Sequence, residues 1–175
     1  GNWSNIITAN TMGEPTTIPY TCDFEDQTER SSWYISNSTA TNKWFIGNAV
    51  TANDSTDTIS GYSLYVSNDN GVTNAYSTGA GSVVVATRQL TSTGAGGYTL
   101  EFNVRTNGES NWDYIKVFAD TNLLQGAATT STTFSPYSYT GNGALKLGAT
   151  QYYYDYDVAG LTTTTAATAV RHLTV

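Results

Sequence analysis

The sequence predicts an all-β protein, a two-sheet antiparallel β-sandwich of the jelly-roll type. Residues that suit strands are abundant, among them 13 tyrosines and many threonines, whereas the strong helix formers Lys, Glu, Leu and Met are scarce. Apolar and polar residues alternate in short runs, and clusters of Gly, Asn, Ser and Thr separate these runs. Charged residues make up only 12% of the chain, so uncharged polar residues must keep it soluble.

Several runs have the composition of strands and are bounded by turn residues. We expect strands at 20–25, 43–47, 63–67, 82–87, 98–105, 114–119, 144–148, 151–155 and 170–175. The dipeptides Asn70-Gly71 and Asn107-Gly108 predict tight turns. Helical periodicity is close to absent along the chain. The one helical turn that we expect is short and lies in residues 27–33.

The 175 residues fit one domain with a substantial core. Residues 1–19 are polar and hold two of the three prolines, so we expect a lead-in segment there, with at most a short strand. Residues 20–175 are expected to form a single β-sandwich domain. The threonine-rich tract 161–168 predicts a strand or loop, with an O-glycosylated stalk as the alternative.

We expect no nucleic-acid partner, because the formal net charge is −7 and no basic patch is present to bind a phosphate backbone. No apolar run of about 18 residues occurs, so we expect no membrane insertion of this segment. Cys22 is the only cysteine, which excludes an internal disulfide, and we expect it to be buried. The expected location is extracellular, on a bacterial cell surface, with the export signal outside this sequence.

The sequence lacks the motifs of common enzymes. His172 is the only imidazole, and no GxSxG, HExxH or phosphate-binding loop before a helix is found. The glycine-rich run 94–97 leads into a predicted strand, so we interpret it as a hairpin connection. Glycoside hydrolysis needs only two carboxylates, and Glu25, Asp113, Asp155 and Asp157 leave that alternative open. We nevertheless expect a non-catalytic protein.

Acidic and amide residues at three places suggest a structural calcium site. Asp23 and Glu25 lie two positions apart on a predicted strand, so their side chains are expected on one face. Asn68 and Asp69 lie in a predicted turn, and Asp113 precedes a predicted strand. Calcium prefers six to eight oxygen ligands of these kinds. In the alternative interpretation, the two carboxylates are solvated and the turn residues only make the turn.

Aromatic residues are the candidates for ligand binding, because their ring faces can stack on a sugar. Trp112 lies in a polar loop, and the run that contains Tyr152 and Tyr154 must point side chains to both faces of a strand. Trp33 and Trp44 are expected in the core. Three Asn-x-Ser/Thr sequons begin at Asn2, Asn37 and Asn53, and they matter only in a host that glycosylates asparagine.

Several blocks follow one another along the chain in a characteristic order: Cys22-Asp23-Phe24-Glu25, Ser32-Trp33, 43–47, 61–71, 82–90, 98–105 and 113–119. This order resembles the cleaved-adhesin domains, relatives of MAM domains in secreted bacterial surface proteins of the gingipain adhesin type. The resemblance covers roughly residues 20–125 and implies a jelly roll, structural calcium and adhesion. It also implies that Asp23, Glu25, Asn68, Asp69 and Asp113 match calcium positions. The chain departs from the family at its end, where residues 171–175 lack the usual Asp-rich closing strand.

These features together predict an extracellular adhesion module that recognises a surface glycan or a host or matrix protein. One alternative is a carbohydrate-binding module detached from a larger surface glycosidase or peptidase. Another is a structural spacer without a ligand. Glycan binding that disappears in a Trp112→Ala variant would separate the second hypothesis from the third, and binding to a matrix protein without any glycan would favour the first.

Overall fold

The computed structural model describes residues 12–50, 59, 61–79, 81–91, 99–105, 114–118, 153–157 and 171–174. In this part of the chain the protein is all-β, and its one helix, α1 (Gln27–Ser31), has five residues. The strands are β1 (Thr16–Thr17), β2 (Tyr34–Ser36), β3 (Lys43–Gly47), β4 (Ser63–Ser67), β5 (Val85–Thr87), β6 (Leu90–Thr91), β7 (Glu101–Val104), β8 (Tyr114–Phe118), β9 (Tyr153–Asp157) and β10 (Arg171–Thr174). The predicted all-β class and the short helical turn are confirmed.

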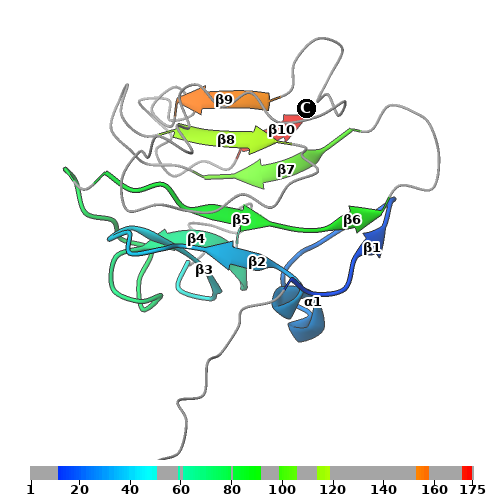
Figure 1. The fold of residues 1–175 in the computed structure, drawn as a ribbon, viewed down its shortest axis with the longest axis horizontal. Helices are drawn as coiled ribbons and strands as arrows, with labels where there is room; N and C mark the ends of the chain where they lie inside the picture. Colours follow the sequence, from blue (N-terminus) through cyan, green and yellow to red (C-terminus); the bar gives the residue numbers. More distant parts are fainter. Residues whose placement is uncertain are drawn as a thin grey trace, which may run out of the picture.

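The described strands pair two by two. The pairs β2–β5, β3–β4, β7–β10 and β8–β9 are antiparallel, and the pair β1–β6 is parallel. In Figure 1, β7, β8 and β9 lie together on one side of β5, and β2, β3 and β4 lie on its other side. The pairs β7–β10 and β8–β9 bring strands from late in the sequence beside strands from its middle, as in Arg171↔Val104 and Asp157↔Tyr114.

The turn that follows β4 is closed by side chains. The hydroxyl of Ser67, which is 0% exposed, donates to Asp69 Oδ1 at 2.6 Å and accepts from the N–H of Gly71 at 3.0 Å. Asp69 also accepts from the N–H and the hydroxyl of Thr73 at 2.9 and 2.7 Å. These bonds, above all the one from Ser67, lower the pKa of Asp69 to about 2. Asn70 and Gly71 have φ of 62° and 86°, which confirms the predicted turn.

Part of the core lies beneath β3 and β4. Tyr65 on β4 is 7% exposed, and its hydroxyl donates to the Gly71 carbonyl at 2.7 Å. Phe45 on β3 stands opposite Tyr65 in the ladder and also contacts the turn. Among the described residues the buried hydrophobic side chains are Ala40, Val50, Tyr65 and Val83. The aromatic pair therefore joins the hairpin to the turn after it.

A buried amide links loops on both sides of this core. Asn42 accepts from the backbone N–H of Ser77 at 2.8 Å and donates to the Ser77 carbonyl at 3.0 Å. Its own backbone N–H donates to the Ser82 hydroxyl at 3.2 Å. The Asn42 side chain therefore acts like a strand partner for Ser77, which satisfies backbone groups that a strand would otherwise pair.

Some sequence predictions need correction. The strand expected at 20–25 is wrong, because these residues form a loop in which Phe24 has a φ of 64° and the Asp23 side chain accepts from the Glu25 N–H at 2.9 Å. Asp23 and Glu25 therefore do not share a strand face. The strand expected at 82–87 begins only at Val85. Cys22, expected to be buried, is half-buried.

The other predicted strands fare better. Those at 43–47 and 63–67 are confirmed with the same bounds. Those at 98–105, 114–119, 151–155 and 170–175 are confirmed in type, as β7, β8, β9 and β10, with shorter or shifted bounds. The strand expected at 144–148 lies outside the described residues.

The end of the predicted lead-in segment forms β1, which pairs with β6. In β1, Thr16 donates its N–H to the Gln89 carbonyl at 3.2 Å, and just after β1 Ile18 donates to the Thr91 carbonyl at 3.1 Å. These bonds hold β1 parallel to β6 in the register Thr16↔Leu90. The described part of the segment is therefore tied to the rest of the chain by backbone hydrogen bonds.

Candidate ligand-binding groove

An open groove lies between α1 and the strands β2 and β3. Its volume is about 680 Å³, and it is a shallow depression that is wide open to solvent. The residues that line it combine aromatic rings with amide, hydroxyl and guanidinium groups. They are Gln27, Arg30, Ser31, Ile35, Asn37, Trp44, Phe45, Ile46 and Tyr62.

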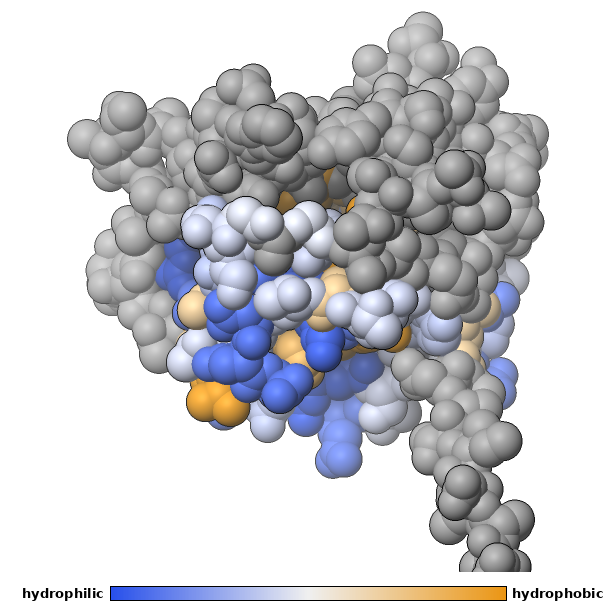
Figure 2. Space-filling view, turned by 60° about the vertical axis from the view of Figure 1, so that its left-hand side comes forward, coloured by the Kyte–Doolittle hydropathy of each residue, from blue (hydrophilic) through white to orange (hydrophobic). Residues whose placement is uncertain are grey.

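The surface around the described strands is mainly polar. Figure 2 shows hydrophilic residues over most of the described surface on that side, with small and separate hydrophobic areas. The most exposed large hydrophobic side chain among the described residues is Val72, at 74%. Scattered apolar residues of this kind are usual on soluble surfaces. A groove that combines rings with polar groups therefore stands out more than any apolar patch on the face in view.

The residues that line the groove include a stacked pair, Arg30 and Tyr62. Arg30 lies on α1, whose first turn is capped by Asp26, which accepts from the Glu29 N–H at 2.9 Å. The Arg30 guanidinium carbon lies 3.7 Å from the centroid of the Tyr62 ring, close enough for a strong cation–π contact. Nη1 of Arg30 also donates to the carbonyls of Phe24 and Glu25 at 2.7 and 2.6 Å. The guanidinium is thus fixed from three directions.

Glu25 holds Tyr62 in place beneath Arg30. Its Oε1 accepts from the Tyr62 backbone N–H at 2.7 Å. The carboxylate fits against Gly61, where a Cβ would lie only 2.2 Å from Oε1 and where φ is +71°, so this position requires glycine. Since Asp23 in turn accepts from the Glu25 N–H, the loop 23–26 positions the groove through its acidic side chains.

Trp44 and Asn37 also line the groove and are bonded to each other. The Asn37 side chain accepts from the Trp44 N–H at 2.7 Å and donates to the Trp44 carbonyl at 2.9 Å. The Trp44 indole N–H donates to the Val84 carbonyl at 3.1 Å. Trp44, like Trp33, was expected in the core, and both are half-buried instead. Trp33 packs on Phe24 with ring centroids 5.3 Å apart.

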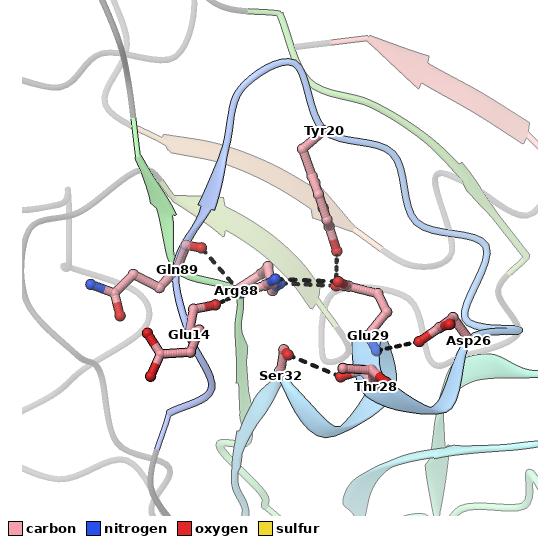
Figure 3. Close-up of polar contacts among 8 residues, drawn as sticks. All are labelled: Glu14, Tyr20, Asp26, Thr28, Glu29, Ser32, Arg88 and Gln89. Carbon is pink, nitrogen blue, oxygen red and sulfur yellow. Dashed lines mark hydrogen bonds and ion pairs between the residues drawn. The ribbon is translucent and has the colours of Figure 1, made fainter.

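A second arginine, Arg88, binds α1 through Glu29 and so connects that helix to the segment between β5 and β6 (Figure 3). Arg88 pairs with Glu29 at 2.9 Å, and the two side chains are only 6% and 21% exposed. Its Nη1 donates to the carbonyls of Glu14 and Gln89 at 2.8 and 3.2 Å. The hydroxyl of Tyr20 donates to the same Glu29 carboxylate. One ion pair therefore joins α1, the N-terminal segment and the link between β5 and β6.

The charges at this ion pair stabilise one another. Burial raises the pKa of Glu29, but hydrogen bonds from Arg88 and Tyr20 outweigh it, so the pKa lies below its usual value. Burial and the bond to Glu29 raise the pKa of Tyr20. Burial lowers the pKa of Arg88, and the contacts with Glu29 and Tyr20 raise it overall. All three groups therefore keep their usual protonation at neutral pH.

The calcium residues predicted from the sequence have local roles where they are described. Asp23 and Glu25 organise the loop before α1, and Asp69 closes the turn after β4. Asn68 donates from its side chain to the Ser77 hydroxyl at 2.9 Å. Within the described ranges, no three Asp, Glu, His or Cys residues come together as a metal-binding group. Asp113 lies outside them, so calcium stays a prediction.

The predicted aromatic site is described only in part. Trp112 and Tyr152 lie outside the described residues, and Tyr154 lies on β9, where it pairs with Val117. The residues that sequence reasoning missed are Arg30 and Tyr62. They are 32 positions apart and meet only through the fold, so no local pattern marks them.

Comparisons with known proteins add no relative. No family model, no curated protein and no solved structure matches the chain. In the described residues no helix is long and apolar enough to cross a bilayer. The function is therefore proposed from the groove itself.

Proposed function

We propose that the protein is a non-catalytic extracellular adhesion module that recognises a surface glycan in the groove between α1 and β3. The observation that carries this proposal is the Arg30–Tyr62 stack in a groove of about 680 Å³. The described all-β strands support a β-sandwich, and we propose that the whole chain forms the two-sheet jelly roll.

The lining has the chemistry that sugars require. A sugar ring presents an apolar face, which stacks on aromatic rings, and a rim of hydroxyls, which bind amide and guanidinium groups. Trp44 and Tyr62 are the aromatic lining residues available to a sugar, because the Phe45 ring packs against the turn at Gly71, and the exposed Gln27 supplies an amide. Among the described residues, those that line the groove carry no carboxylate, and this favours binding over the acid–base chemistry of a glycosidase.

Variants on two sides of the groove test the proposal. Binding to a glycan array is measured for the parent protein and for Gln27→Ala and Tyr62→Ala. Each variant is expected to lower the affinity for the glycan that the parent protein binds most tightly by roughly tenfold, because one stacking or hydrogen-bonding group is lost. Gln89→Ala is the matched control, because Gln89 is also exposed but is not among the residues that line the groove.

Further variants test the role of the Tyr62 ring and distinguish this groove from the Trp112 surface that the sequence predicted. Tyr62→Phe keeps the ring under Arg30 and is expected to retain most of the binding. If glycan binding is lost in Trp112→Ala and kept in Tyr62→Ala, the ligand occupies the Trp112 surface instead. If the protein binds a host or matrix protein and no glycan at all, the adhesion proposal stands and the glycan proposal fails.

A further inference from the structure

Two arginines in this protein are held in the same way. Arg88 donates from Nη1 to two backbone carbonyls, lies 5.4 Å from the centroid of the Tyr20 ring, and directs Nε and Nη2 to the Glu29 carboxylate at 2.9 and 3.2 Å. Arg30 also donates from Nη1 to two carbonyls and lies over a tyrosine, Tyr62. The two sites share the same fixation of the guanidinium.

They differ in what meets the second edge of the guanidinium. In Arg88 the Nε–Nη2 edge binds both oxygens of a carboxylate, the geometry that arginine favours. Among the described residues, no carboxylate meets the corresponding edge of Arg30, and all of its hydrogen bonds go to carbonyls. Arg30 lines the open groove, whereas Arg88 is buried.

The neighbouring acids do not replace that missing partner. Glu25 uses its Oε1 to bind the Tyr62 N–H, and Asp26 uses its carboxylate to cap α1. The Arg30 charge contributes to the lowered pKa of Asp26, but the hydrogen bond from the Glu29 backbone is the main cause. Both acids thus hold the loop, and among the described residues neither forms an ion pair with Arg30.

We propose that the groove is selective for acidic sugars, whose carboxylate binds the Nε–Nη2 edge of Arg30 as Glu29 binds that of Arg88. This inference rests on the proposed glycan-binding function and names the class of glycan. The guanidinium is already fixed by Tyr62 and by two carbonyls, so little conformational entropy is lost when the carboxylate binds. General electrostatics cannot provide this selectivity, because the chain has a net charge of −7 and repels anions.

The test compares ligands that differ only in the carboxylate. Affinities are measured by calorimetry for tri-galacturonic acid and its full methyl ester, and for sialyllactose and lactose. At least one acid is expected to bind roughly tenfold more tightly than its neutral partner, as a bidentate charge-assisted contact predicts. Arg30→Lys keeps the charge but loses the planar edge, and is expected to remove most of that preference.

The outcomes separate this inference from the proposal on which it rests. Equal binding of acidic and neutral sugars would overturn the selectivity and leave glycan binding in place. Binding of none of these sugars, with none on the array, would overturn both. A peptide with a free C-terminal carboxylate that binds more tightly than every acidic sugar, and better than its amidated form, would overturn the choice of a sugar. The ligand pairs remain informative even where Arg30→Lys disturbs the loop 24–25.

Discussion

The side-chain amide of Asn37 pairs with both backbone polar groups of Trp44, accepting from its N–H at 2.7 Å and donating to its carbonyl at 2.9 Å. Residue 37 directly follows β2, and Trp44 is the second residue of β3. The amide therefore forms with Trp44 the two hydrogen bonds that the backbone of a neighbouring strand would form. This contact fixes two of the residues that line the groove.

Replacing Asn37 by alanine is expected to destabilise the fold by about 1–2 kcal/mol, because two hydrogen bonds to the backbone are lost at a half-buried position. Urea unfolding measures the change. Thr39→Ala is the control, since Thr39 is exposed in the same loop, and it is expected to lie within about 0.5 kcal/mol of the parent protein. Equal stability of the two variants would contradict the role assigned to the amide.

The same geometry predicts that the sequon Asn37-Ser38-Thr39 stays unmodified in the folded protein. A glycan on Nδ2 would replace the hydrogen on the Oδ1 side of the amide, which is the one donated to Trp44. Intact mass after expression in a glycosylating host, followed by peptide mapping, measures occupancy. Full occupancy at Asn37 with an unchanged melting temperature would show that the contact with Trp44 is dispensable.

The ion pair of Arg88 with Glu29 predicts a loss of stability in acid. The pKa of Glu29 is lowered in the folded protein, so its contribution is fully present above the unfolded value, about 4.3, and is lost as pH falls through the folded value. Glu29→Gln is expected to cost about 2 kcal/mol at pH 7 and to reduce the dependence of stability on pH below about 4.3.

Glu14→Gln provides the matched control for that experiment. Glu14 contacts Arg88 through its backbone carbonyl, and its side chain is exposed, so the same chemical change should leave the stability curve nearly unaltered. The variants are compared by denaturant unfolding at about five pH values between roughly pH 2.5 and pH 7. Parallel curves for Glu29→Gln and the parent protein would show that another carboxylate governs the acid response.

Two glycines with positive φ separate backbone strain from packing. Gly71 has a φ of +86°, and a Cβ there would lie 2.9 Å from Phe45 Cδ1, whereas Gly79 has a φ of +74° and no described atom within 4 Å of a Cβ. Both alanine variants are expected to be strained, at about 1 kcal/mol. Gly71→Ala is expected to cost at least about 1 kcal/mol more, because Phe45 must also move. Equal melting temperatures for the two variants would contradict the contact.

The calcium predicted from the sequence is tested by thermal unfolding with millimolar Ca²⁺ and with EDTA. An ion bound only by the folded state raises the free energy of unfolding, by about 2.7 kcal/mol when its concentration is a hundredfold above Kd. The melting temperature rises as a result. Asp23→Asn and Asp113→Asn are expected to reduce that shift, and Glu14→Gln is expected to leave it unchanged. A melting temperature that is the same in Ca²⁺ and EDTA would remove the calcium prediction.

The sequence predicted the elements whose signals are local. The strand 63–67 and the Asn70-Gly71 turn followed from strand composition and turn chemistry, whereas the Asp26 cap of the short helix is seen only in the structure. The same alternation was misleading at 20–25, because it does not distinguish a strand from a loop in which Asp23 binds its own backbone.

The groove could not be predicted from the sequence, for a different reason. Arg30 meets Tyr62 only because Glu25 holds the backbone of residue 62, a contact between segments 37 positions apart. Sequence reasoning looked for exposed rings and paired carboxylates, whereas this site depends on an arginine fixed by carbonyl oxygens. Only tertiary contacts show which edge of that arginine is occupied.

The pairing of β1 with β6, together with the bond from Arg88 to the Glu14 carbonyl, has a practical consequence for the choice of fragments. A fragment that starts at residue 20 would lose both and leave a buried guanidinium with one acceptor fewer. The shortest fragment with the full stability of the parent protein should therefore start no later than Glu14. Recombinant fragments trimmed to Tyr20 should unfold at a lower temperature and expose the edge of β6 to association with other chains.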